Sequence, residues 1–371
     1  MKSSLLKNLF LYVIGFGLLA LVIQQNWASK PGKTTHNEKA LTLLAGSLAD
    51  SHIQLDKSTP GIGELLSRPV NVWYLLAAAT LWSVASLITF YRWYVLVRAQ
   101  DLPFTVRNAI RLGLVGSFFN AFLPGAVGGD ILKAVFLARE QSRRTVAVAT
   151  IVVDRVLGLW ALGWLVAVSG GLFWLTGNDT LLNNESLKTI VRVIALIVIV
   201  SGSIFVLMGM FSEERSTRIA NRLERISKVG GSLAELWRAG VMYRQKLRAL
   251  GFAFCLTIVG HLGWVFIFYL CVSAFPDVKV APFSEHLLVV PVGMTAQALF
   301  PMPGGVGGGE AAYGWLYTLL GVPATGGILG CLVQRIIAWG IGLIGYLMYT
   351  RMKKEIPSGE LETESVVATA A

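Results

Sequence analysis

Charged residues are scarce in this 371-residue chain, and histidine and cysteine are scarcer still. Asp, Glu, Lys and Arg together make up 14% of the residues, whereas about a quarter is usual in a soluble domain. The four histidines and three cysteines show neither the clustering of a metal site nor CxxC spacing, so we expect no metal, cofactor or disulfide framework. The sequence also lacks the motifs of Ser-His-Asp hydrolases, zinc proteases and nucleotide-binding loops, so no catalytic residue is nominated.

Hydrophobic residues, by contrast, make up 54% of the chain, and its mean hydropathy is +0.63. This composition is typical of an integral membrane protein. The formal net charge of +11 would suggest nucleic-acid binding in a soluble protein. Here the basic residues fall between apolar segments, where they set membrane orientation and contact anionic head groups. We therefore expect membrane lipids with phosphate-bearing head groups as partners, and no nucleic acid.

Two proline–glycine breaks interrupt long apolar segments and organise the rest of the chain. One break is LPGAVGGD at 123–130, and the other is MPGGVGGGE at 302–310. Two such interrupted segments at matching places in two halves point to a binding site between the repeats of a transporter. The residues expected to bend the backbone or let it approach a ligand are Pro124, Gly125, Gly128, Gly129, Pro303, Gly304, Gly305, Gly307 and Gly308.

Each break ends on an acidic residue, Asp130 or Glu310, at the start of the helix expected to follow it. A carboxylate in this position can cap free backbone amides and face the positive end of the helix dipole. Alternatively, it binds a cation, a proton or an amine-bearing head group. The sequence leaves both interpretations open.

Arg155 and Arg335 lie deep in apolar spans, each 25 residues after the acid of its own break. A charge at such depth costs at least about 3 kcal/mol, so each arginine needs an acidic partner or an anionic ligand. The nearest partners are Asp130 for Arg155 and Glu310 for Arg335, or the same acids exchanged between the halves. A buried salt bridge and binding of a lipid phosphate by the guanidinium group both remain open.

Further polar residues in the apolar segments are candidates for substrate binding. Asp154 in the first half corresponds in position to Gln334 in the second, which would confine a proton-coupled role to one half. Asn120 and Gln297 precede the two breaks, and their amides can bond the freed backbone. Lys133, one turn after the first acid, would face a head group or reach the cytoplasmic surface.

The lengths of the apolar segments predict an all-α polytopic membrane protein with about six full transmembrane helices. The limbs of each broken segment are too short to cross singly, so we expect two re-entrant helical hairpins. Arg92 and Arg98 lie at an aromatic belt and mark the cytoplasmic end of one span, and both termini are expected on that side. The expected regions are 1–69, a first transmembrane helix and external loop; 70–211, repeat 1; 212–248, a basic amphipathic cytoplasmic loop; 249–350, repeat 2, inverted relative to the first; and 351–371, a disordered cytoplasmic tail.

The runs at 118–130 and 301–310, together with Asp154-Arg155, resemble the lysylphosphatidylglycerol synthase transmembrane region, a flippase-like family of membrane domains. The resemblance covers roughly residues 70–350. It implies a bacterial or archaeal inner-membrane protein that moves a lipid, or helps to move it, between leaflets. Bifunctional members carry a separate soluble domain for aminoacyl transfer, which we do not expect here.

We therefore expect a non-enzymatic lipid flippase or transporter of the cell inner membrane. Its substrate would be a phospholipid or a lipid-linked molecule of the polyprenyl or hopanoid type. Two alternatives stay open. One is a scaffold that holds a glycosyltransferase or lipid-synthesis enzyme through 212–248, and the other is an integral membrane enzyme acting on lipid-linked substrates.

Overall fold

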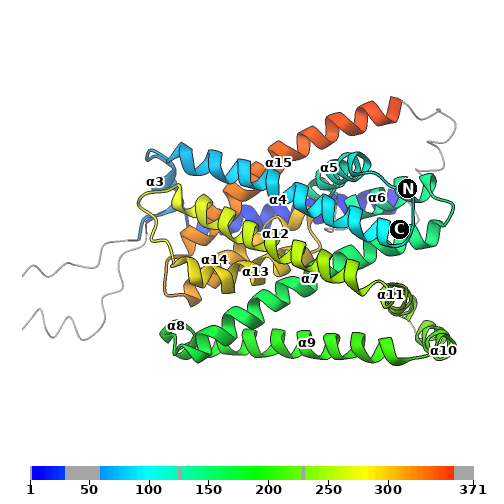
Figure 1. Cartoon of the computed structure of the whole chain (residues 1–371). Helices are drawn as coiled ribbons and strands as arrows, with labels where there is room; N and C mark the ends of the chain where they lie inside the picture. Colours follow the sequence, from blue (N-terminus) through cyan, green and yellow to red (C-terminus); the bar gives the residue numbers. More distant parts are fainter. Residues whose placement is uncertain (1, 30–58, 124–127, 227–229, 355–371) are drawn as a thin grey trace, which may run out of the picture.

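A computed structural model describes residues 2–29, 59–123, 128–226 and 230–354, and its regular elements are helices (Figure 1). In chain order they are α1 (Lys2–Gln25), α3 (Ile62–Leu66), α4 (Val72–Ala99), α5 (Val106–Phe122), α6 (Gly128–Glu140), α7 (Arg144–Leu175), α8 (Asp179–Leu182), α9 (Glu185–Met210), α10 (Glu213–Glu224), α11 (Gly230–Tyr243), α12 (Leu247–Ser273), α13 (Phe283–Leu299), the 3₁₀ turn η1 (Pro303–Gly305), α14 (Gly308–Leu319) and α15 (Ala324–Lys354).

Six helices in the described part of the chain are long and apolar enough to cross a membrane: α1, α4, α7, α9, α12 and α15. The prediction of an all-α polytopic membrane protein with six spans is thus confirmed. Polar caps start several helices, because a side-chain oxygen satisfies a backbone amide that has no partner in the first turn. Asn71 accepts from Trp73 N at 3.1 Å before α4, and Asn184 accepts from Leu187 N at 3.1 Å before α9.

The second break shows why its sequence must be rich in glycine. Helix α13 ends where Phe300 becomes extended, and the chain then turns through η1 before α14 begins. Gly304, Gly305 and Gly307 have φ values of 55°, 67° and 79°, in the left-handed region that glycine enters without a steric penalty. In the first break Leu123 is extended after α5, whereas Pro124 and Gly125 lie outside the described residues.

The unit α4–α5–α6–α7 and the unit α12–α13–α14–α15 make corresponding contacts with each other. Helix α4 packs beside α12, and the two run in opposite directions (Figure 1). Helix α5 packs on α15, and the matching helix α13 packs on α7. Exchanging the two units therefore maps one contact onto the other, as a two-fold relation between repeats requires. The inverted repeat and the re-entrant hairpins themselves remain predictions.

Gly345 allows α15 to approach α5 closely, because a Cβ atom there would lie 2.1 Å from Leu114 O. We expect Gly345→Ala to lower the free energy of unfolding by about 1–3 kcal/mol, since either backbone must shift to make room. A Cβ atom added at Gly340, on the same helix, would have no neighbour within 4 Å. Gly340→Ala should therefore be neutral, or stabilising by up to about 1 kcal/mol. Unfolding in mixed micelles measures the free energy of unfolding of both variants. Equal values for Gly345→Ala and Gly340→Ala would contradict the close contact between α15 and α5.

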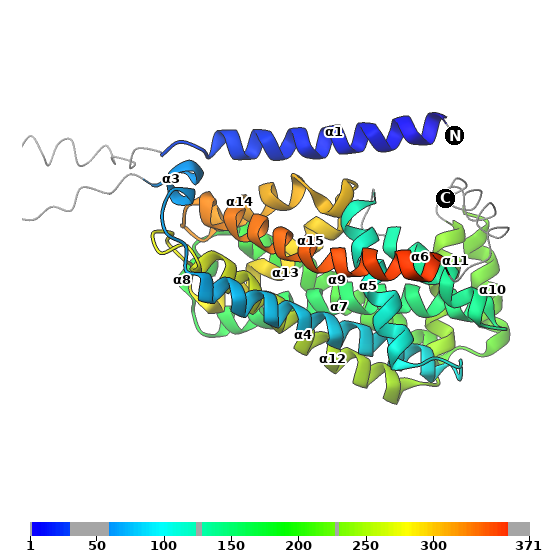
Figure 2. The same cartoon turned by 90° about the horizontal axis from the view of Figure 1, so that it is seen from above.

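Three peripheral segments complete the structure. Helix α1 lies along one side of the bundle (Figure 2) and touches both breaks: the Tyr12 hydroxyl donates to Phe122 O, and Gly15 O lies 2.6 Å from a Cβ atom built on Gly307. The basic segment expected as a loop at 212–248 contains α10 and α11, which pack together. The last span continues to Lys354, so the first four residues of the expected tail, 351–354, are helical, whereas 355–371 lie outside the described residues.

Candidate functional site

Glu310 and Arg335 form an ion pair that fixes the second break. Arg335 Nε lies 2.7 Å from Glu310 Oε1, and the two side chains are only 4% and 0% exposed. The same guanidinium group donates to the carbonyl oxygens of Gly304 at 2.8 Å and Gly305 at 3.3 Å. Glu310 Oε2 accepts from Gly307 N at 2.8 Å, so this acid also caps α14. The capping and salt-bridge interpretations both hold here, and one buried network satisfies the freed backbone.

Asp130 and Arg155 form the corresponding pair at the first break, with Lys133 added. Asp130 Oδ2 lies 2.6 Å from an Arg155 guanidinium nitrogen, and Oδ1 lies 2.6 Å from Lys133 Nζ. The Lys133 ammonium also lies 5.3 Å from the centre of the Trp93 ring, within cation–π range. Asp130 in the first turn of α6 therefore has two cationic partners, whereas Glu310 has one. Each arginine pairs within its own half, and the exchanged pairing does not occur.

Asn120 and Gln297 bond the backbone of the break that follows each of them. Asn120 Oδ1 accepts from Gly129 N at 2.8 Å, and Gln297 Nε2 donates to Gly304 O at 3.1 Å. Gly129 also lets α6 approach α5, because a Cβ atom there would lie 1.9 Å from Gly116 O. The two amides thus support the breaks from corresponding positions, as the sequence predicts.

Asp154 pairs with Arg92, which the sequence predicts to lie at the cytoplasmic end of a span. Arg92 is 6% exposed, and its Nε and a terminal nitrogen bond the two Asp154 carboxylate oxygens at 2.7 and 2.8 Å. Another Arg92 nitrogen donates to Thr257 Oγ1 at 3.3 Å. Arg92 is therefore a buried partner of Asp154 and not an exposed interfacial side chain, and the side of the membrane that it marks stays a prediction. The buried Asp154 carboxylate on α7 requires a positive charge, and Arg92 on α4 supplies it in a bidentate geometry.

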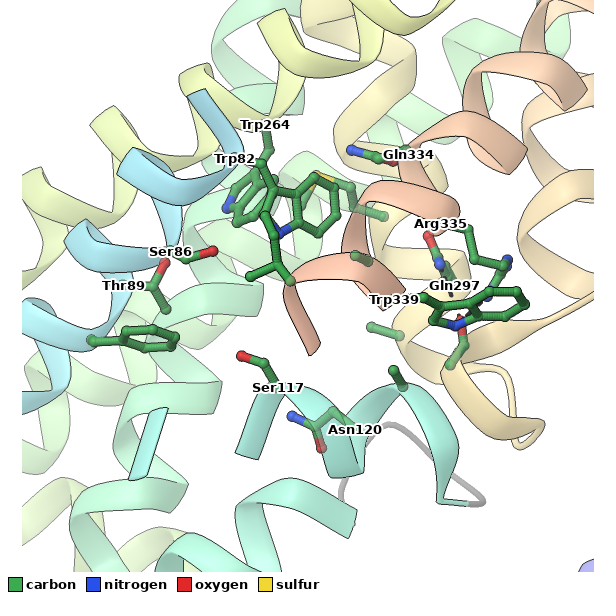
Figure 3. A pocket seen from close by; sticks show the side chains of 17 residues that line it. Trp82, Ser86, Thr89, Ser117, Asn120, Trp264, Gln297, Gln334, Arg335 and Trp339 are labelled. Carbon is green, nitrogen blue, oxygen red and sulfur yellow. Dashed lines mark hydrogen bonds between the residues drawn. The ribbon is translucent and has the colours of Figure 1, made fainter. Parts of the chain in front are cut away.

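A cavity of about 350 Å³ opens between the two units (Figure 3). Its walls come from α4, α5, α12, α13, η1 and α15, so both units contribute. Five of the residues singled out from the sequence line it: Asn120, Gln297, Gly304, Gln334 and Arg335. Asp130, Lys133, Asp154, Arg155 and Glu310 are not among its lining residues and act in the ion pairs described above.

Two polar side chains on the cavity wall are buried and lack a hydrogen-bond partner among the described residues. Ser86 on α4 is 9% exposed and Gln334 on α15 is 6% exposed. Their polar atoms reach the cavity and are not enclosed by protein, so they are available to a ligand or water there. Figure 3 shows the Ser86 hydroxyl directed into the space between the walls.

Three tryptophans line the cavity that were not predicted from the sequence as site residues. Trp82 on α4 and Trp264 on α12 meet edge to face, with ring centroids 4.3 Å apart. Trp339 on α15 stands apart from them, beside Arg335 (Figure 3). Their positions in the middle of apolar spans, away from the aromatic belts at the ends, are the signal that sequence reasoning missed.

The described residues contain no group of three or more His, Cys, Asp or Glu side chains that could hold a metal ion. His261 bonds Gly158 O at 3.0 Å through Nε2 and is not among the residues that line the cavity. The arrangement can therefore bind a small group by hydrogen bonding and aromatic contact at the junction of two units.

A family model described as "Lysylphosphatidylglycerol synthase TM region" matches residues 62–345, which is most of the chain. The matched range contains both breaks, the three arginine–acid pairs and every residue of the cavity wall. The comparisons with curated proteins and with solved structures found no significant match.

Proposed function

The chain belongs to the lysylphosphatidylglycerol synthase transmembrane-region family, and on that basis we propose that it moves lipid molecules between the two leaflets of a membrane. It is a multi-pass membrane protein with six candidate spans in the described residues. The cavity between the two units is the proposed head-group site, and the lipid chains stay outside it. The substrate is a phospholipid or a lipid-linked molecule of the cell inner membrane, where both protein termini face the cytoplasm.

The observation that carries this proposal is the position of the cavity. It lies where α4 of one unit meets α12 and α15 of the other, next to the second break. Transporters built from repeats with broken helices bind substrate at such junctions, because the units can rock against each other around a fixed site. Ser86 and Gln334 offer hydrogen bonds that no described residue uses, so a head group can bond them without displacing a protein contact.

The ion pairs have a supporting role in this proposal. Arg335 already bonds Glu310 and two backbone carbonyls, so it holds the break beside the cavity more than it offers a free charge. Arg155 is 28% exposed at its side chain, and its pair with Asp130 holds the first break in the same way. The two units can then tilt as bodies while their internal ion pairs persist.

Filling the cavity tests the proposed site directly. Ala338 lines the cavity on α15, whereas Ile336 on the same helix is 63% exposed. We expect Ala338→Trp to slow the translocation of fluorescent lipids in proteoliposomes about tenfold or more, because the indole occupies the space of the head group. Ile336→Trp adds the same side chain outside the cavity and should keep the parent rate.

Size-exclusion chromatography and thermal unfolding establish that both tryptophan variants are folded. Equal rates for the parent and for folded Ala338→Trp would overturn the cavity as the transport site. If the parent protein moves no lipid at all while a synthesis enzyme co-purifies with it, the scaffold alternative gains support.

A further inference from the structure

The cavity wall carries little charge that a ligand could use. Among the described residues that line it, Arg335 is the one with a formal charge, and Glu310 neutralises it at 2.7 Å. Its terminal nitrogens are also engaged, by the carbonyl oxygens of Gly304 and Gly305. A phosphate entering the cavity would have to displace these bonds inside a buried network, and breaking such a network is costly.

Apart from the indole N–H groups of the tryptophans, the remaining polar groups on the wall are hydroxyls and carboxamides, from Ser86, Thr89, Ser117, Asn120, Gln297 and Gln334. Thr89 donates to Ala85 O at 2.9 Å, which leaves its oxygen able to accept. Asn120 uses its oxygen in the bond to Gly129 N, and Gln297 uses its nitrogen in the bond to Gly304 O. Uncharged groups of this kind bond hydroxyls as both donors and acceptors, and they do not compensate a full charge.

The aromatic part of the wall complements these groups. Trp82 and Trp264 meet at an interplanar angle of 77°, which forms a corner of two indole rings, and Trp339 lies on a different part of the wall. Sites lined by aromatic rings with a few placed hydroxyl and amide groups suit ligands that have apolar faces and polar edges. A sugar ring has this character, because its C–H groups form the faces and its hydroxyls form the edge.

Building on the proposed lipid translocation, we propose that the cavity binds an uncharged, hydroxyl-rich head group, of the glycosyl type, that is carried on a lipid. A volume of about 350 Å³ holds a sugar-sized group but not a two-chain lipid. Gln334 and Ser86, whose polar atoms bond no other described residue, bond the hydroxyls, and the tryptophans pack on the ring faces. The phosphate of the lipid, where present, lies outside the cavity.

Three probes, compared in pairs that differ in one feature, distinguish this head group from others. Decyl β-D-glucoside and decyl phosphate have the same alkyl chain and differ in the head group, and free glucose lacks the chain. Binding to the full chain in nanodiscs is followed by intrinsic tryptophan fluorescence, because Trp82, Trp264 and Trp339 line the cavity. We expect the glucoside to bind most tightly and free glucose to bind at least about tenfold more weakly, since it lacks the chain.

Gln334→Leu is the decisive variant. It should weaken glucoside binding about fivefold to tenfold through the loss of hydrogen bonds, and leave the binding of decyl phosphate unchanged. It should leave the melting temperature unchanged, because the Gln334 side chain makes no hydrogen bond to another described residue that the substitution would remove. A substitution that acted only by damaging the structure would lower the melting temperature together with the binding. Ser86→Ala should weaken glucoside binding less, and Ser83→Ala, which is on the exposed side of the same helix, should leave it unchanged.

Tighter binding of decyl phosphate than of the glucoside would overturn the inference, as would equal binding by free glucose, or glucoside binding that Gln334→Leu leaves intact. None of these results would touch the proposed translocation, which depends on the rate in the Ala338→Trp experiment. Conversely, if glucoside binding depends on Gln334, the inference about the head group stands even if no transport is seen.

Discussion

Glu310→Ala is expected to lower the free energy of unfolding by about 3–5 kcal/mol, as is typical when one partner of a buried ion pair is removed. The Arg335 side chain is 4% exposed and would remain in place with a full charge and no carboxylate beside it. Helix α14 would also lose the bond from Gly307 N to Glu310 Oε2. Denaturation in mixed micelles, followed by circular dichroism, measures the loss.

The corresponding arginine of the first break provides a matched comparison. In Arg155→Ala the acid Asp130 keeps Lys133 at 2.6 Å, and the Arg155 side chain is 28% exposed, so we expect a loss of only about 1 kcal/mol. The double change Glu310→Ala with Arg335→Met should regain a large part of the stability lost in Glu310→Ala, because no buried charge is then unpaired. A double variant as unstable as the single one would contradict this explanation.

Arg92→Ala is expected to have an effect of similar size, about 3–5 kcal/mol, since it leaves the Asp154 carboxylate buried without a cation. Arg92 bonds both carboxylate oxygens, and the two side chains are 7% and 9% exposed. Arg92→Lys should restore only part of the stability, because one ammonium group cannot reproduce the two parallel bonds of the guanidinium fork. The free energy of unfolding in mixed micelles distinguishes the three proteins.

Arg98 on the same helix is the control for Arg92. It is exposed and donates to Leu102 O at 3.1 Å, so Arg98→Ala should cost about 1 kcal/mol or less. If Arg92→Lys were as stable as the parent, the bidentate pair would not be the feature that holds α4 to α7.

The spans and breaks could be predicted because each is encoded locally. A helix that crosses a membrane needs about 20 apolar residues, and proline and glycine interrupt such a run where they stand. The sequence also indicated the pairs of Asp130 with Arg155 and of Glu310 with Arg335 as possible ion pairs. Each acid starts one helix and its arginine lies in the next full span, at the same separation in both halves.

The pairing of Arg92 with Asp154 and the composition of the cavity could not be predicted in this way. Arg92 stands between Tyr91 and Trp93, and its neighbours resemble an interfacial belt; only the packing of α4 on α7 brings it 2.7 Å from Asp154. The cavity depends on how α4, α12 and α15 meet, which no local pattern specifies. One signal was available: the Asp154 carboxylate within an apolar span needs a cation, and the neighbouring Arg155 already had a partner.

Photochemical labelling shows where the lipid head group lies. A lipid with a photoreactive group on its head is incorporated into nanodiscs with the protein, irradiated, and the labelled peptides are identified by mass spectrometry. We expect label in the α4, α12 and α15 peptides that carry Trp82, Trp264 and Gln334, and its loss in Ala338→Trp but not in Ile336→Trp. Label confined to exposed surfaces such as α9, and unchanged when the cavity is filled, would contradict a head-group site between the two units.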